Sequence, residues 1–163
     1  LVTDVVELGR RDRIQPELLR VHEAIGILID ELALTHERLR GIVNVDCPSS
    51  IWLRFDRNHL HRILTNLVEN SLRYCKNLPG SIHIGARVDG VTGHVEVSVR
   101  DDGPGVVVDV RDRLFEPFFT TRSAGTGLGL YIARELCEAN DATLGLVPSD
   151  KGACFRVTGK GEQ

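Results

Sequence analysis

The sequence is 163 residues long, with 42% hydrophobic and 26% charged residues, the balance of one globular domain with its own core. Its formal net charge of -3 gives no basic field for nucleic acid, and no apolar stretch approaches the roughly 20 residues that span a bilayer. We therefore expect a folded domain that neither binds DNA nor inserts into a membrane.

The N-terminal part of the chain predicts helices. Residues 1–13 have a roughly helical pattern, broken by Pro16, and predict the end of an upstream dimerisation helix or a linker, with the domain itself at 14–163. Residues 17–40 predict an amphipathic helix that ends near Gly41. Its apolar residues recur three, four and seven positions apart: Leu18, Val21, Ile25, Leu28, Ile29, Leu32 and Leu39.

A short β-rich region precedes the next helix. Strands are predicted at 42–45 and 51–55, and Asp56 predicts the cap of a helix over 57–75. One stripe of that helix should face the core, formed by Leu60, Ile63, Leu64, Leu67, Ser71 and Leu72.

The remaining chain predicts two hairpins and one helix. The predicted elements are strands at 81–89 and 94–100, a short segment at 109–114, a helix at 127–140, and strands at 142–147 and 153–158. Helices interleaved with antiparallel hairpins favour a two-layer α/β sandwich, with a mixed, largely antiparallel sheet packed on helices. A doubly wound parallel sheet is disfavoured, because no βαβ alternation is evident.

The sulfur-containing residues bear on the compartment of the protein. Four cysteines are scattered without a C-x-x-C pair, so neither a zinc cluster nor a disulfide framework is indicated, and a reducing cytosol fits best. The chain starts at Leu1 and contains no Met. We therefore expect a piece cut from a longer protein, and the parent can still be a membrane protein.

The first of four ordered motifs is NLVENSLRYC. Asn66, Asn70 and Arg73 are four and three residues apart, so they share one helical stripe, distinct from the leucine stripe. Amide oxygens suit Mg²⁺, and a guanidinium suits phosphate. Exposed asparagines that merely solvate a helix are the alternative.

The second motif, DDGPG, ends an apolar strand. Its glycines let the backbone turn sharply and leave the Asp101 carboxylate at the end of the strand, where it can accept from an adenine amine. A plain surface turn is the alternative, because Asp, Gly and Pro are common turn formers.

The third motif, FEPFF, holds three of the five phenylalanines and precedes a polar segment. Aromatic anchors beside a Gly/Ser-rich loop are typical of a lid that closes over a ligand, where Arg122 can reach a γ-phosphate. Phenylalanines that only fill the core are the alternative.

The fourth motif, GTGLGL, opens a helix, so bare amides and the helix dipole can hold phosphate oxygens. It lacks the G-x-G-x-x-G spacing of a dinucleotide fold, and no Lys-Ser/Thr follows as in a Walker A loop. Together the four motifs predict an ATP site.

In this order the motifs resemble the N, G1, F and G2 boxes of the catalytic ATP-binding (Bergerat-fold) domain of bacterial two-component sensor histidine kinases, within the GHKL superfamily of gyrase, Hsp90 and MutL. The resemblance covers residues 14–158 and implies Mg²⁺ on Asn70 with help from Asn66, and a lid over 106–124. It further implies that the nucleotide contacts Arg73, Tyr74, Asp101, Gly103, Gly105, Phe115, Thr121, Arg122, Gly125, Thr126, Gly127, Leu128 and Gly129, with Asn66, Asn70 and Arg73 acting in catalysis.

One position separates kinase from hydrolase in this superfamily. Its ATP-hydrolysing members carry a glutamate base four residues before the metal-binding asparagine, where this chain has Asn66. A neutral amide cannot deprotonate water, so phosphoryl transfer to a protein side chain is favoured. Glu69 lies about 100° around the helix from Asn70 and is a poor substitute.

The phosphoacceptor is not among the six histidines, which we interpret as surface or structural. The resemblance implies that the acceptor lies on the parent's own dimerisation domain, upstream, and that a cognate response regulator is the next partner. It implies a cytoplasmic domain of a homodimeric parent in the bacterial inner membrane, with a monomeric fragment. The segment FFTTRSAGTGLGLYIARELCEAN is most similar to the nitrogen-regulatory and type IV pilus sensor kinases, and NLVENSLRYC and ELGRR agree with the pilus branch. A free-standing ATPase and a non-catalytic module that docks a regulator are the alternatives.

Overall fold

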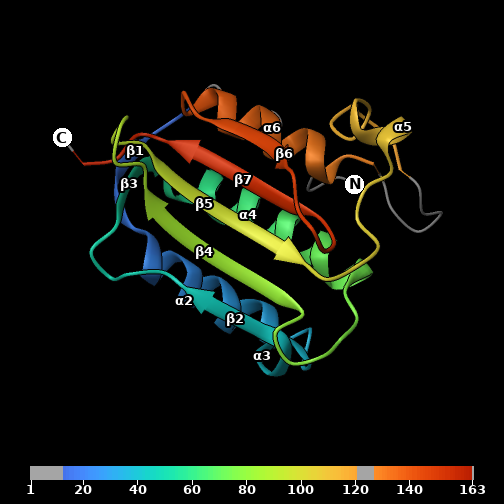
Figure 1. Ribbon diagram of the computed structural model, residues 1–163. Helices are drawn as coiled ribbons and strands as arrows, with labels where there is room; N and C mark the ends of the chain where they lie inside the picture. Colours follow the sequence, from blue (N-terminus) through green and yellow to red (C-terminus); the bar gives the residue numbers. More distant parts are fainter. Residues whose placement is uncertain (1–12, 121–126, 163) are drawn as a thin grey trace.

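The computed structural model describes residues 13–120 and 127–162. A five-stranded sheet forms one layer, and the long helices lie behind it in the second layer (Figure 1). The buried apolar side chains of both layers form one core. The predicted two-layer α/β sandwich is therefore confirmed.

The large sheet is mixed. Its strand order is β2 (Val43–Asp46), β4 (Ile82–Val88), β5 (Val95–Asp101), β7 (Cys154–Gly159) and β6 (Thr143–Val147). Every neighbouring pair is antiparallel except β2 and β4, which are parallel. One parallel pair agrees with the predicted mixed, largely antiparallel sheet, and the chain passes from β2 to β4 through a strand of another sheet and a helix. β2 has only four residues, half of them polar, and gave no sign of a parallel partner.

The N-terminal helix prediction also needs correction. Residues Pro16–Arg20 form strand β1, which pairs antiparallel with β3 (Trp52–Asp56) in a separate two-stranded sheet. The helix is limited to α2 (Val21–Ala33), and a short helix α3 (Leu39–Ile42) follows after a turn. Only from Val21 does the buried set keep helical spacing, whereas the backbone of 16–20 is satisfied by a strand 36 residues away.

Two longer helices carry the predicted motifs. α4 (Arg57–Tyr74) begins as predicted, because the Asp56 side chain accepts a hydrogen bond from the His59 amide at 3.0 Å. Its predicted apolar stripe is buried. α6 (Gly129–Ala139) starts two residues later than predicted, and the segment near 109–114 contains the short helix α5 (Val108–Arg111).

Strand alternation fixes which residues of β5 face the helices. Val95, Val97 and Val99 are buried against the helix layer, and Asp101 continues the same face by period two. Arg100 points to the opposite, open face of the sheet. Asp101 is therefore delivered to the end of the sheet between the two layers.

Two general properties complete the description. No helix in the described ranges is long and apolar enough to cross a membrane. All four cysteines are unpaired thiols.

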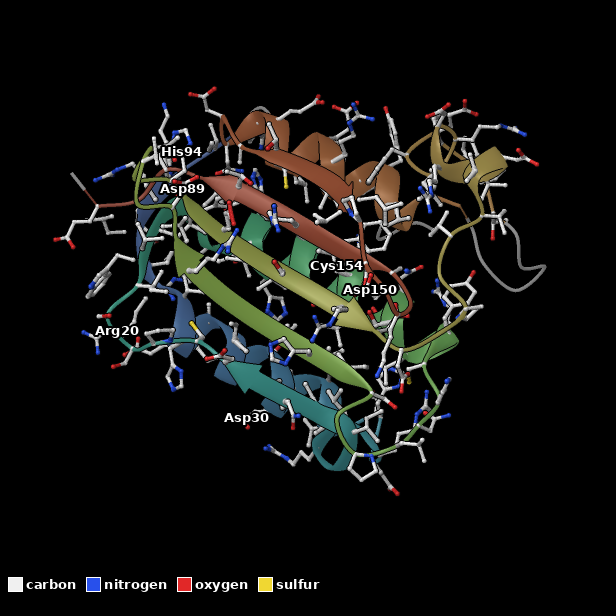
Figure 2. All side chains as sticks on the ribbon, in the orientation of Figure 1. Arg20, Asp30, Asp89, His94, Asp150 and Cys154 are labelled. Atoms are coloured by element: carbon white, nitrogen blue, oxygen red, sulfur yellow. The ribbon has the colours of Figure 1, made fainter. Side chains whose placement is uncertain are left out.

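Figure 2 shows the two ends of the large sheet. Asp150, in the β6–β7 turn, lies at the end where β5 finishes, and Asp89 and His94 lie at the other end.

Candidate functional site

The first motif and the fourth meet where α4 packs along α6. The Asn66 side chain is only 9% exposed, and its Nδ2 donates to the Gly129 carbonyl at 2.9 Å. The N-box helix is thus bonded to the first residue of the glycine-box helix, as a shared site requires.

The other N-box residues lie further along α4. Asn70 is half-buried, and none of the described residues hydrogen-bonds its amide. Arg73 is exposed at the end of the helix. Glu69 points elsewhere, since its Oε2 lies 4.0 Å from His36 Nε2. That placement agrees with the expectation that Glu69 does not serve as a hydrolytic base.

Asp101 is the most unusual polar residue of the site. It is 3% exposed, and its Oδ1 accepts from the amides of Gly103 at 2.9 Å and Ala153 at 3.3 Å. Its Oδ2 is buried and has no hydrogen-bond partner among the described residues. Burial raises the pKa of this carboxyl above its ordinary value, although both donated amide bonds favour the charged form. A buried acceptor of this kind suits a ligand's N–H donor.

Ser71 is a further candidate for the site, although its place on the apolar stripe of α4 predicted a core residue. Ser71 is fully buried on α4. Its hydroxyl has no hydrogen-bond partner of good geometry among the described residues. The hydroxyl nevertheless lies near the Asp101 carboxylate, and it lowers the pKa of that group against the larger effect of burial. A small polar residue on an apolar stripe was the available signal. Asp101 and Ser71 together place two unsatisfied polar atoms between the layers.

Asp102 has a different role from its neighbour. Its Oδ1 accepts from the Lys76 amide, and its Oδ2 from the Ser81 hydroxyl, both at 2.8 Å. These bonds outweigh the effect of burial and lower the pKa of the carboxyl. Asp102 therefore ties the end of β5 to the α4–β4 loop, leaving Asp101 for a ligand.

Close backbone approaches explain two glycines around Asp101. A Cβ on Gly103 would lie 2.5 Å from the Tyr74 carbonyl oxygen, which brings the end of α4 against the DDGPG turn. Gly152 in the β6–β7 turn has φ +59°, and a Cβ there would lie 2.7 Å from Asp101 Oδ1. Gly105, which was predicted to contact the nucleotide, lies against the Gly152 backbone, since a Cβ on it would be 3.1 Å from the Gly152 carbonyl oxygen.

The FEPFF segment is anchored by one aromatic ring. Phe115 meets Phe155 of the core edge-on, with centroids 6.2 Å apart, while Arg134 of α6 lies over the Phe115 ring. Phe118 is 69% exposed. Phe115 is thus a core anchor, as the alternative interpretation held for part of the motif, and it also ties the segment to α6.

The glycine motif is only partly described. Phe118, with φ +66°, donates its amide to the Gly127 carbonyl at 2.9 Å, so these two residues are bonded together. Leu128 is buried, and α6 follows from Gly129. The predicted residues Thr121, Arg122, Gly125 and Thr126 lie outside the described residues.

These features fit a magnesium nucleotide. The buried Oδ2 of Asp101 offers an acceptor for an exocyclic amine, and the start of α6 offers bare amides for phosphates. In the described ranges no three His, Cys, Asp or Glu side chains could together hold a metal ion. A cation would therefore depend on amide oxygens such as that of Asn70, phosphates and water, which Mg²⁺ accepts.

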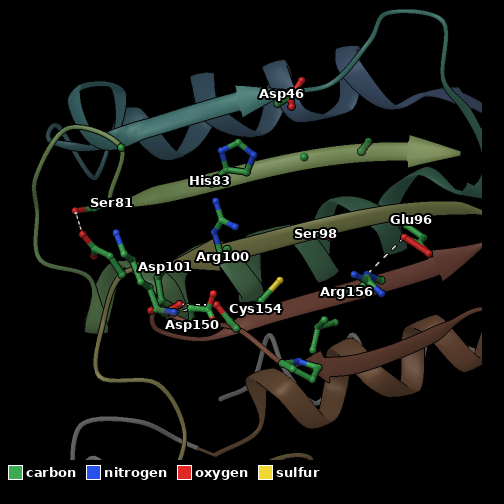
Figure 3. Close-up of a pocket in the computed structure, with 18 of the residues that line it drawn as sticks. Asp46, Ser81, His83, Glu96, Ser98, Arg100, Asp101, Asp150, Cys154 and Arg156 are labelled. Atoms are coloured by element: carbon green, nitrogen blue, oxygen red, sulfur yellow. Dashed lines mark hydrogen bonds and ion pairs between the residues drawn. The ribbon is translucent and has the colours of Figure 1, made fainter. Parts of the chain in front are cut away.

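A separate hollow of about 900 Å³ lies on the open face of the large sheet (Figure 3). His83, Arg100 and Cys154 stand in register across its floor, and Glu96 pairs with Arg156 at 3.6 Å. Of the predicted nucleotide residues that the structure describes, only Asp101 reaches its lining. The hollow therefore lies on the opposite face of the sheet from Asn66 and α6.

Comparison with known sequences identifies the relatives of this chain. The family model described as histidine kinase-, DNA gyrase B- and HSP90-like ATPase matches residues 55–162, which contain all four motifs. Sensor protein kinase PilS of Pseudomonas aeruginosa is 38% identical, over 97% of this chain and 30% of PilS. Histidine protein kinase SaeS of Staphylococcus aureus is 28% identical, over 96% of this chain and 47% of SaeS. The chain thus spans less than half the length of these relatives.

Solved structures agree on the fold. The catalytic domain of histidine kinase ThkA, in a nucleotide-free form, superposes with a TM-score of 0.74 at 27% identity, over 90% of this chain and 95% of that domain. Acinetobacter baumannii histidine kinase AdeS gives a TM-score of 0.77 at 23% identity, over all of this chain and 78% of that one. The two-layer arrangement is therefore shared.

Proposed function

Because this chain belongs to the family of histidine kinase-, DNA gyrase B- and HSP90-like ATPases, as a catalytic domain of the two-component histidine kinase type, we propose that it binds Mg-ATP and donates the γ-phosphate to a histidine outside the chain. That histidine would belong to the parent's dimerisation domain, joined to this domain near residue 14. A response regulator would then receive the phosphate. The identity to PilS supports placing the parent in the pilus-type branch, and an inner-membrane location is part of this proposal.

Asp101 carries the proposal. A carboxylate oxygen that is buried and has no partner costs stability, so its presence is best explained by a ligand that supplies a donor. The N6 amine of adenine is such a donor, and the adjacent Ser71 hydroxyl can bond a ring nitrogen. The purine would then lie between β5 and α4.

The remaining residues would act by position and charge. Asn70 would contribute an oxygen to the metal, Arg73 would meet phosphate oxygens, and the amides at the start of α6 would hold the phosphates. Magnesium, when bound, neutralises phosphate charge. Phosphoryl transfer depends largely on such alignment and electrostatic stabilisation, so the domain needs no nucleophile of its own.

Two of the chain's histidines already have partners within the fold. His59 is 2% exposed and hydrogen-bonded to Asn140, and His36 lies beside Glu69. These placements agree with the structural interpretation of the histidines and support an acceptor supplied from outside.

Calorimetry with Mg²⁺ and a non-hydrolysable ATP analogue tests the binding. We expect binding by the wild type and a loss in Asn70→Ala that is largest when Mg²⁺ is present. No binding by the wild type would refute the proposal. Addition of the parent's dimerisation hairpin should yield acid-labile phosphohistidine, and its absence with an ATP-binding domain would refute the kinase role.

A free-standing ATPase is the second candidate function. It is disfavoured because Asn66 stands where the hydrolases carry glutamate, and because Asn66 is hydrogen-bonded as a donor. Steady phosphate release by the isolated domain, abolished in Asn70→Ala, would favour the ATPase instead.

A further inference from the structure

Hydrogen bonds join both ends of α6 to α4. α4 and α6 run antiparallel, since Asn66 meets Gly129 at the start of α6 while His59 meets Asn140 just after its end. Apolar side chains pack between the two links. Each link can therefore set the position of one end of α6.

The far end of α6 is held independently of any ligand. Asn140 Oδ1 accepts from the Asp56 amide at 2.8 Å, while its Nδ2 donates to the Leu136 carbonyl at 2.7 Å and lies 2.9 Å from His59 Nδ1. All of these groups are buried. Three bonds to one amide fix this end against both α4 and β3.

The glycine-rich end of α6 is held in a different way. Gly129 has no side chain, and a Cβ built on it would meet no atom within 4 Å, although its neighbours Leu128 and Ile132 are buried. The N-cap residue is Leu128, whose side chain has no atom that could accept a capping hydrogen bond. The Asn66 amide, which is nine-tenths buried, supplies a direct side-chain bond to Gly129. A carbonyl oxygen can accept two bonds, so this link is compatible with the helical bond of Gly129.

We propose that Asn66 is a positioning residue that fixes the first turn of α6 for nucleotide phosphates. The inference rests on the proposed nucleotide-binding function. The positioning role uses the N–H donor of Asn66, whereas a metal ligand would use its oxygen, so substitutions can separate the two roles.

Hydrogen exchange in the nucleotide-free chain is the first test. The Ile132 amide donates to the Leu128 carbonyl at 2.8 Å and reports on the first turn of α6. Loss of one net hydrogen bond should speed its exchange by roughly threefold to tenfold in Asn66→Ala and in the isosteric Asn66→Asp, which cannot donate. Asn70→Ala is the matched control on the same helix and should exchange at the wild-type rate.

Calorimetry with adenosine and ADP is the second test. Asn66→Ala should weaken ADP by roughly threefold to tenfold with or without Mg²⁺, and should leave adenosine unchanged. Asn70→Ala should remove only the Mg²⁺-dependent part of ADP affinity. Wild-type exchange at Ile132 in both Asn66 variants, with a loss confined to Mg-ADP, would overturn the inference. If the wild type binds neither adenosine nor ADP, the proposed function itself is refuted.

Discussion

Substitution of Asp101 by asparagine tests adenine recognition at one atom. Asp101 Oδ1 is held by the amides of Gly103 and Ala153, both of which are donors. An asparagine must therefore keep its oxygen at that position and place its NH₂ where Oδ2 stands. The substitution converts the free acceptor into a donor and leaves the shape of the site unchanged.

The expected effect on nucleotide affinity is large. An adenine amine loses a charge-assisted hydrogen bond of about 1.5–3 kcal/mol and meets an unsatisfied donor that costs about 1–3 kcal/mol more. The sum corresponds to roughly a 10² to 10⁴-fold loss of Mg-ADP affinity. A 6-oxopurine presents an acceptor at the same position, so Mg-IDP should bind Asp101→Asn better than Mg-ADP does, the reverse of the wild type.

Calorimetry with the two nucleotides measures this directly, and thermal melting without nucleotide provides a check. Because burial raises the pKa of Asp101, its contribution to stability is present at low pH and is lost as pH rises through the folded-state pKa. At pH 7 Asp101→Asn should therefore melt at a higher temperature than the wild type. An unchanged preference for ADP in a folded variant would refute the assignment of Asp101 to adenine.

Three further substitutions or modifications test the surroundings of the site. Gly152→Ala places a Cβ 2.7 Å from Asp101 Oδ1 at a residue with φ +59°. This substitution should lower the melting temperature by roughly 5–10 °C, and an unchanged melting curve would contradict the close approach. Phe115→Ala should destabilise the domain by about 2 kcal/mol in denaturant unfolding, whereas the 69% exposed Phe118 should tolerate alanine within about 0.5 kcal/mol. Burial raises the pKa of the Cys137 thiol to about 12, so iodoacetamide at pH 8 should label it only after unfolding, as mass spectrometry can establish.

Local sequence patterns predicted the parts of the fold that depend on local structure. The helix after Asp56 was predicted from its cap and its leucine spacing, and both are present. The β4–β5 hairpin followed from alternation around the Asp89–Gly93 turn. The same alternation delivers Asp101 to the layer boundary, so its place in the site was predictable from its strand.

Pairing between distant segments was not predictable in the same way. The segment at 16–20 has two adjacent leucines and reads as an extension of α2, yet it pairs with β3, and nothing local in its sequence specifies that partner. The parallel pairing of β2 with β4 depends equally on distant residues. Backbone hydrogen bonding between remote strands overrode helical spacing at this end of the chain.

The site shows the same division between near and distant partners. Asn66, Asn70 and Asp101 were predicted as site residues from spacing and from the order of the motifs. Ser71 was placed in the core because its position fits the apolar stripe, and its relation to Asp101 appears only when α4 packs on β5. The Ala153 amide bonds Asp101 across 52 residues and follows no motif.

The link between Asn66 and Gly129 also bears on how a kinase domain and a hydrolase can share this fold. A glutamate at position 66 would supply a base, but its carboxylate cannot donate to the Gly129 carbonyl, and two oxygens would then face each other in a buried site. We therefore expect Asn66→Glu to loosen the start of α6 instead of producing an efficient ATPase. With a glutamate at this position, another group would have to supply the hydrogen bond to the start of α6. The amide at position 66 offers no base to water, and in the proposed role it also supplies the bond to the start of α6.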